Sequence, residues 1–243
     1  MSIPPLARVF DEVAGVYEDT RPSYPPAALN VLNVGPRHRV LDLGAGTGKF
    51  TRLLAGTGAQ ITAVEPLAAM RAKLEQAVPT AEVHGGTAEQ IPLPDASFDL
   101  VTVAQAFHWF DPDRALPEIA RVLVNSGRLA VVWNSWDPDD PIGAEVLRVL
   151  SPYDPPDLRR RHEDALAVLS RSTHFHGATQ RTLHYTETFD LDRLVGRVAS
   201  ISWIASAPEA ARVSVEASIR QLATSPGPFA VELRTNLCMC VRR

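Results

Sequence analysis

The chain has 243 residues, of which 45% are hydrophobic and 21% are charged, with a formal net charge of −4. This composition fits one globular α/β domain, and the acidic balance gives no general field that would attract nucleic acid or an anionic membrane. No run approaches the roughly 18 apolar residues of a membrane span, and the first ten residues lack the features of a signal peptide, so we expect a cytoplasmic protein without nucleic-acid or membrane partners.

The N-terminal part is predicted to be helical. Apolar residues recur at the spacing of one helix face over residues 7–18. Pro22 and Pro25 then favour an extended turn, and a short helix over 27–32 leads into the first strand.

A glycine-rich turn follows this first strand. A short apolar run with one acid, Asp42, ends in glycines at alternate positions, Gly44, Gly46 and Gly48. Apolar residues then restart at helical spacing, which predicts a strand, a turn and a helix over 49–55. Because glycine accepts positive φ and lets backbone approach a ligand closely, this turn suits a nucleotide-like molecule.

Spacing separates three kinds of site at this turn. A phosphate-binding P-loop would need a glycine where this chain has Leu43 and a hydroxyl where it has Phe50. The dinucleotide fingerprint would end on Lys49 instead of its third glycine, which weakens but does not exclude an NAD(P) site. The remaining pattern, D-x-G-x-G-x-G with Glu65 after a predicted strand over 60–64, places an acid where it could accept both hydrogens of a ribose diol.

Each of these two acids also has a purely structural interpretation. Asp42 could accept backbone N–H groups of the turn, and Glu65 could cap the helix that begins at Pro66.

The pattern resembles class I S-adenosylmethionine-dependent methyltransferases. The segment Phe10-Asp-x-x-Ala14-x-x-Tyr17, followed by Arg21-Pro-x-Tyr24, is similar to the N-terminal lid of the small-molecule group of these enzymes, which includes the trans-aconitate methyltransferases. The resemblance implies S-adenosylmethionine as cofactor and S-adenosylhomocysteine as product. The cofactor-binding residues that it implies are Asp42, Gly44, Gly46, Gly48, Glu65, Pro66, Thr87, Ala88, Glu89 and Gln105.

Strands and helices are predicted to alternate up to residue 133. Right-handed crossovers between successive strands imply a parallel sheet with helices on both faces. The expected strands cover 81–84, 98–103 and 128–133, and the expected helices cover 66–79 and 117–124.

Two local features carry separate expectations. Residues 86–92 are predicted to form a turn into a short helical stretch from which an adenine could be contacted, although the family commonly has an acid in place of Thr87. Pro117 predicts a separate first turn between the Asp111 cap and the helix proper.

The acceptor side is expected after the fourth strand, at the edge where doubly wound sheets bind ligands. Gln105, His108 and Trp109 lie in this segment. Together with Tyr17 and Arg21 of the lid, His108 is a candidate for acceptor-side catalysis. Arg21 could hold a carboxylate bidentately, whereas a hydroxyl acceptor would need His108 as a base.

The C-terminal part contains fewer motifs. Two late strands, over 179–188 and 231–241, are expected to complete the sheet as the antiparallel edge pair of the family. Cys238 and Cys240 are predicted to be packed thiols, and no metal site is expected. The expected helices cover 142–150, 157–170, 191–203 and 208–222.

The predicted fold class is α/β, a doubly wound and mostly parallel seven-stranded sheet of the Rossmann-like methyltransferase type, with an antiparallel last strand and an N-terminal helical lid. We expect one domain over 1–243, comprising a lid (1–36), a donor-binding core (37–133), a helical acceptor region (134–178) and a sheet-completing part (179–243).

The predicted function is methyl transfer from S-adenosylmethionine, in line, to a small molecule such as a carboxylate, by a monomer or homodimer. The alternatives are a non-catalytic donor-binding or interaction module and an NAD(P)-dependent oxidoreductase.

Overall fold

The computed structural model describes residues 20–155, 165–222 and 227–243. The predicted helix over 7–18, with Tyr17, lies outside these ranges. The described strands are β1 (Arg39–Leu43), β2 (Gln60–Val64), β3 (Glu82–His84), β4 (Phe98–Ala104), β5 (Leu123–Trp136), β6 (Phe175–Phe189) and β7 (Phe229–Arg242).

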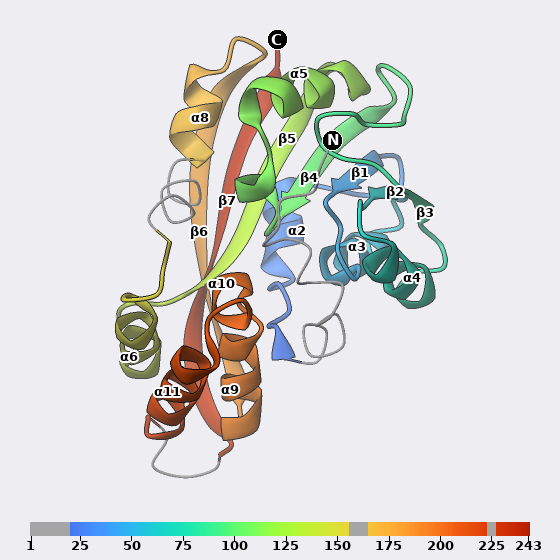
Figure 1. Ribbon diagram of the computed structural model, residues 1–243. Coiled ribbons are helices and arrows are strands. Elements are labelled where there is room, and N and C mark those ends of the chain that lie inside the picture. The colour runs from blue at the N-terminus through green and yellow to red at the C-terminus, as the bar shows by residue number, and fades with distance from the viewer. Residues whose placement is uncertain (1–19, 156–164, 223–226) are drawn as a thin grey trace.

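These strands form one sheet in the order β3-β2-β1-β4-β5-β7-β6 (Figure 1). The first five strands pair in parallel, and β7 runs antiparallel to both β5 and β6. The predicted seven-stranded, mostly parallel sheet with an antiparallel last strand is therefore confirmed.

Helices cover the sheet and one of its ends. The described helices are α2 (Ala27–Leu32), α3 (Lys49–Ala55), α4 (Ala68–Ala77), the 3-10 helix η1 (Phe107–Trp109), α5 (Pro112–Val122), α6 (Pro141–Leu150), α8 (Ala165–Arg171), α9 (Leu191–Ala199), α10 (Ser202–Ala205) and α11 (Glu209–Arg220). None of these described helices has both the length and the apolar character that a membrane crossing requires.

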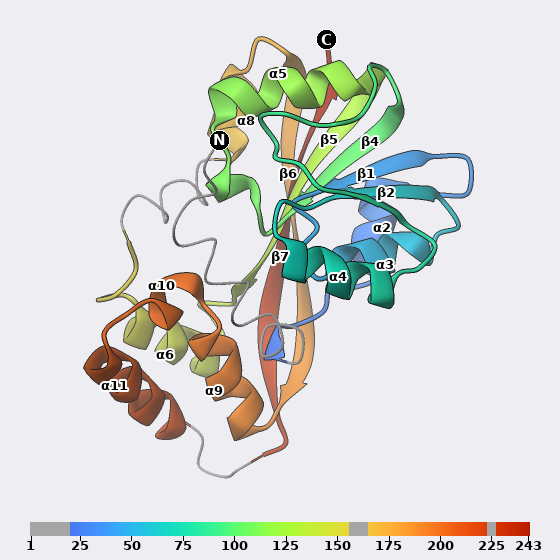
Figure 2. The same cartoon turned by 45° about the vertical axis from the view of Figure 1, so that its right-hand side comes forward.

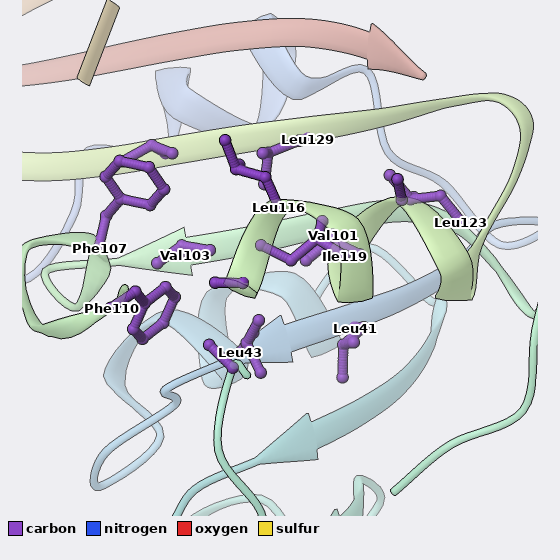
Figure 3. Packing of buried hydrophobic residues seen from close by; sticks show 14 of the residues in the cluster. Leu41, Leu43, Val101, Val103, Phe107, Phe110, Leu116, Ile119, Leu123 and Leu129 are labelled. Atoms are coloured by element: carbon purple, nitrogen blue, oxygen red, sulfur yellow. The ribbon is translucent and has the colours of Figure 1, made fainter. Parts of the chain in front are cut away.

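One face of the sheet packs against α5 and α8. Figure 3 shows Leu116 and Ile119 of α5 close to Val101 of β4 and Leu129 of β5. Alternate residues of a strand point to the same face, so each parallel strand contributes to this core and to the opposite one. The thiols of Cys238 and Cys240 belong to this cluster, both buried and free, as predicted.

The opposite face packs against α2 and α3. Val40 and Leu100, the alternate residues of β1 and β4, form a second cluster with Leu32 of α2 and with Phe50 and Leu54 of α3. Both faces of these strands are therefore buried, as expected for a doubly wound sheet.

Four helices, α6, α9, α10 and α11, form what we call the helical cap. Figures 1 and 2 show them gathered around the ends of β6 and β7 that lie far from β1 and β4. Their core contains Trp136, Phe189, Leu194 and Leu233. Leu233 and Leu237 share a face of β7, and Leu237 packs with α2 and α3, so the cap continues that helical layer along the sheet.

The expectation of a separate turn before Pro117 was wrong, because α5 is one continuous helix. The Asp111 side chain accepts the N–H of Asp113 at 3.2 Å and caps the helix. Proline removes a single N–H at this point, whereas buried Leu116 and Ile119 hold the helix against the sheet.

Two further boundaries differ from the prediction. β5 begins at Leu123 and continues to Trp136: Leu123 and residues 128–132 pair with β4, and residues 128–136 pair with β7. Residues 86–92 form a turn closed by a bridge between Thr87 and Gln90, not a helical stretch. A Cβ at Gly86 would lie 2.6 Å from Pro92 Cδ, so the turn folds back on itself at a position that needs glycine.

Candidate active site

A cavity of about 670 Å³ lies at the carboxyl edge of the parallel strands. This volume is within the range of roughly 300–1,000 Å³ that is usual for small-molecule sites. The cavity is bordered by the segments that follow β1, β2, β3 and β4, and the strand order reverses between β1 and β4. Open α/β sheets bind their ligands at such a switch point.

The glycine turn after β1 forms one wall. Gly44, Gly46 and Gly48 have φ values of 72°, 58° and 88°, which strongly favour glycine. A Cβ at Gly44 would lie 2.7 Å from the Cβ of Ala106, whereas one at Gly46 would meet nothing within 4 Å. Gly46 lines the cavity, so a side chain there would reduce the space for a ligand.

Gly48 has a different role. It stands at the N-cap of α3, where an added Cβ would lie 3.1 Å from Leu74 Cγ. The described lining of the cavity does not include Gly48. The glycine therefore permits close packing of the turn on α4.

The carboxylate of Glu65, at the end of β2, lines the cavity although the residue is only 5% exposed. Its Oε2 accepts the N–H of Gly46 at 2.9 Å, and its Oε1 accepts the N–H of Leu67, the N-cap residue of α4, also at 2.9 Å. A carboxylate has about four acceptor positions, so these two bonds are compatible with contact to a ligand hydroxyl. The structural role and the predicted ribose role are compatible.

Asp42 lies beneath the turn and not in the cavity. It is fully buried, and its two oxygens accept the hydroxyls of Thr51 at 2.7 Å and Thr102 at 2.9 Å. Burial raises the pKa of Asp42 to about 6, although both hydroxyls act in the opposite direction. The described lining of the cavity does not include Asp42, whose side chain ties β1 to α3 and β4.

The predicted adenine side is brought together in the cavity. Pro66, Thr87, Ala88 and Glu89 all line it. The Oε1 atom of Glu89 accepts the N–H of Asp111 at 3.0 Å, which connects this turn to the start of α5. Glu89 thus secures the loop whose backbone borders the cavity.

Gln105, directly after β4, has a φ of 57° and lines the cavity. Two hydrogen bonds hold it there, from its N–H to Val132 O at 2.8 Å and from its Nε2 to Asn134 O at 2.9 Å. Residues other than glycine rarely adopt this backbone conformation, and such strain is concentrated at functional sites.

His108 is not brought to the main cavity within the described residues. It lines a neighbouring space of about 10 Å³, together with Trp133 and Gln105. Its ring lies 4.5 Å from that of Trp109, which does line the main cavity. In this arrangement Trp109, and not His108, borders the main cavity.

The first described segment, residues 20–24, passes alongside the cavity, and we call it the strap. The Tyr24 ring lines the cavity and packs edge-on against Phe50 at 4.7 Å. The Arg21 guanidinium points elsewhere, because its Nε donates to the Ser200 hydroxyl and its Nη2 to the Ser200 carbonyl, both at 3.0 Å. Arg21 therefore joins the strap to the end of α9.

Several lining residues were missed from the sequence. Lys49 follows the glycine turn directly, which could have indicated it, and its Nζ donates to the Arg21 carbonyl at 2.7 Å. Val168 gave no signal, because it is an apolar residue of a helix far along the chain. In the part of the chain that the structure describes, no three His, Cys, Asp or Glu residues could together hold a metal ion.

Comparison with known proteins gives consistent matches. The family model "Methyltransferase domain" matches residues 41–131, which include the glycine turn, Glu65 and Gln105. An uncharacterised methyltransferase of Mycobacterium tuberculosis (strain H37Rv) is 40% identical over 221 residues, covering 89% of this chain and 86% of the relative. Another, from Schizosaccharomyces pombe, is 41% identical over 137 residues, covering 54% of this chain and 55% of the relative.

A solved structure has a similar fold. It is a provisionally assigned type II methyltransferase from Anaeromyxobacter dehalogenans, with a TM-score of 0.70 and 24% identity, covering 92% of this chain and 97% of that one. At this identity the likeness concerns the fold alone.

Proposed function

Since this chain belongs to the class I S-adenosylmethionine-dependent methyltransferases, we propose that it transfers the methyl group of S-adenosylmethionine to a small carboxylate. The observation that supports donor binding most strongly is the bond between Glu65 and Gly46 on the wall of a cavity of about 670 Å³. The same cavity reaches Tyr24, Gln105 and Trp109, so one space has room for both reactants.

The residues present fit this donor. Gly46 leaves open space where any other residue would place a side chain, and Glu65 offers acceptor positions suited to the two hydroxyls of a ribose. Thr87 and Ala88 border the cavity where the adenine is expected. When bound, S-adenosylmethionine supplies a methyl group activated by a positively charged sulfur.

The protein contributes mainly orientation and exclusion of water. An acceptor carboxylate is ionised at neutral pH and needs no base, which agrees with the position of His108 outside the main cavity. Its oxygen lone pair forms the new bond to the methyl carbon while the carbon–sulfur bond breaks and its electron pair remains on sulfur. Tyr24, Phe107 and Trp109 surround the site with aromatic surface that excludes water.

Calorimetric titration of the purified protein with S-adenosylmethionine, S-adenosylhomocysteine and NAD tests the donor. We expect micromolar affinity for the two adenosyl compounds and no binding of NAD. Binding of NAD without either adenosyl compound would overturn the proposal and restore the oxidoreductase alternative.

The class of acceptor has its own assay. After incubation with donor labelled in its methyl group and a set of small organic acids, a methyl ester would release labelled methanol in mild base. Label that is transferred but resists base would instead point to a hydroxyl, amine or carbon acceptor. No transfer to any acid would contradict the carboxylate proposal.

A further inference from the structure

One wall of the cavity carries no charge. Within the described lining, residues 104–110 supply a single polar side chain, that of Gln105, and α8 supplies only Val168. Phe107 and Trp109, from the same loop as Gln105, also line the cavity. We call Phe107, Trp109 and Val168 the apolar wall.

The charged side chains of the described lining belong to other segments. Lys49 begins α3, Glu65 follows β2, Glu89 follows β3, and Asp111 and Arg114 lie at the start of α5. Three acids thus accompany two cations on this surface. Because carboxylates that leave water need cations or other donors as partners, this balance disfavours an acceptor with several carboxylates. A single carboxylate can be balanced by the positively charged sulfur of the donor.

The turn after β4 directs Trp109 towards the cavity. The 3-10 helix η1 is closed by a bond from the N–H of Phe110 to Phe107 O at 3.1 Å. Side chains three residues apart lie one above the other in such a turn, and the rings of Phe107 and Phe110, 6.0 Å apart, are both buried in the core. Trp109 lies on another side of the turn, is only partly buried, and lines the cavity.

Val168 comes from a helix far along the chain that packs on the same core. Ala165 and Leu169, one helical turn apart, are the buried residues of α8. Val168 lies beside them, packs against the same cluster as Trp109 and lines the cavity. Both side chains therefore present apolar surface to the cavity. An apolar group of a ligand that covers this surface is removed from water, which is favourable.

Gln105 offers a polar contact next to this wall. Its Nε2 donates to Asn134 O at 2.9 Å. Because a carbonyl oxygen only accepts, this bond fixes which end of the amide faces β5, and Nε2 has a second hydrogen with which to donate to a ligand carboxylate. Gln105 precedes Phe107 by two residues, so a carboxylate bound at this amide has the apolar wall beside it.

We propose that the methyl acceptor is a monocarboxylic acid whose apolar group, a ring or a branched chain, lies on the apolar wall, and that Trp109 and Val168 select it. The inference rests on the proposed function and specifies its substrate class. An acid with several carboxylates would place charge against this wall, which is unfavourable. Trp109 and Val168 are thus specificity-determining residues.

The test uses the full chain saturated with S-adenosylhomocysteine and titrated calorimetrically with hydrocinnamate, isocaproate and glutarate. All three carry a carboxylate. Hydrocinnamate adds a phenyl ring and isocaproate a branched chain, whereas glutarate adds a second carboxylate. We expect both apolar acids to bind about tenfold more tightly than glutarate, or better.

A charge on the apolar wall should abolish this preference. Val168→Asp should weaken the binding of hydrocinnamate by about tenfold or more and leave affinity for S-adenosylhomocysteine within about twofold of wild type. Val213→Asp makes the same change at a 60% exposed valine of α11 and is the matched control. The control should change neither affinity.

A larger side chain at the same position gives a readout that a purely structural role would not move. Val168→Phe fills space at the wall and keeps it apolar, so the preference should shift by about tenfold from the ring of hydrocinnamate towards the smaller isocaproate. Thermal unfolding shows whether each variant is folded, and Val168→Phe serves if Val168→Asp is not.

The proposal fails if glutarate binds the wild-type complex as tightly as the apolar acids do, or if none of the three acids binds. It also fails if the folded Val168 variants keep the affinities of wild type. Failure of the wild-type protein to bind S-adenosylhomocysteine would instead refute the proposed function. The two failures are therefore distinguishable.

Discussion

The carboxylate of Glu65 accepts the backbone N–H of Gly46 at 2.9 Å, across 19 positions of sequence. The acid at the end of β2 thus fixes the shape of the turn that follows β1. Because Glu65 also lines the cavity, one side chain both shapes the turn and borders the proposed donor site.

Replacing this acid should weaken donor binding. In Glu65→Gln, one oxygen that accepts a backbone N–H becomes an amide that cannot, and such bonds to charged groups contribute about 1.5–3 kcal/mol. We expect affinity for S-adenosylmethionine to fall about 10- to 100-fold by calorimetry. Glu82→Gln, at an exposed position on β3, is the control and should bind as wild type. Equal affinities of the two variants would remove Glu65 from the site.

A pair of glycine substitutions separates backbone strain from loss of space. Gly46 and Gly58 have φ values of 58° and 76°, so alanine at either should destabilise the fold by about 1–2 kcal/mol. Only Gly46 lines the cavity. By urea unfolding, the two variants should therefore lose similar amounts of unfolding free energy. Donor affinity, in contrast, should fall at least tenfold in Gly46→Ala alone. A comparable fall in Gly58→Ala would mean that strain, and not space, governs binding.

Asp42 should make stability depend on pH. Its pKa is about 6 in the folded chain and about 3.8 in the unfolded one, so between these values the folded state alone keeps the proton. The unfolded state then binds fewer protons, and this residue's contribution to stability is full below about pH 4 and is lost as pH rises through 6. The loss amounts to about 3 kcal/mol.

The measurement compares Asp42→Asn with wild type by urea unfolding at pH 4.5 and pH 7.5. Asparagine does not ionise. From pH 4.5 to pH 7.5, the free energy of unfolding of the variant should therefore rise by about 2–3 kcal/mol relative to that of wild type. Other acids titrate equally in both proteins and cancel. A difference in stability that does not change with pH would show that Asp42 has an ordinary pKa.

The core between α5 and the sheet offers a test of packing. Ile119 of α5 is fully buried and packs close to Val101 of β4, as Figure 3 shows. Ile119→Ala should therefore lower the free energy of unfolding by about 2–5 kcal/mol. Val213 of α11 is 60% exposed, and its replacement by alanine should change stability by about 0.5 kcal/mol or less. A small loss for Ile119→Ala would mean that this layer repacks freely.

Local pattern was sufficient to predict the elements nearest the donor site. The predicted ranges of α2, β1, α3 and β2 agree with the structure, because each is a short apolar segment bounded by proline or glycine. β5 and β6 extend well beyond their predicted ranges. Residues 134–136 of β5 and residues 175, 176 and 189 of β6 lie outside the predicted ranges and pair with β7, a partner that no local window contains.

The sequence pointed to several residues of the site, but it did not show the role that each of them has in the fold. The sequence singles out Asp42 as an acid beside a glycine turn. The hydroxyls that donate hydrogen bonds to its carboxylate come from Thr51 and Thr102, which are 9 and 60 positions away. Arg197 gave no signal at all, because an arginine on an amphipathic helix usually faces solvent. Its guanidinium carbon lies 3.5 Å from the centroid of the Trp136 ring, 61 positions away, a contact that exists only in the folded chain.

The bond between Arg21 and Ser200 joins positions 179 residues apart. On the ribosome, where chains grow at about 5–20 residues per second, residue 200 emerges long after the glycine turn is complete. A nascent chain therefore has the elements of the glycine turn many seconds before the strap can bond to the end of α9. Docking of the strap onto α9 is therefore among the last steps by which the chain can complete this fold.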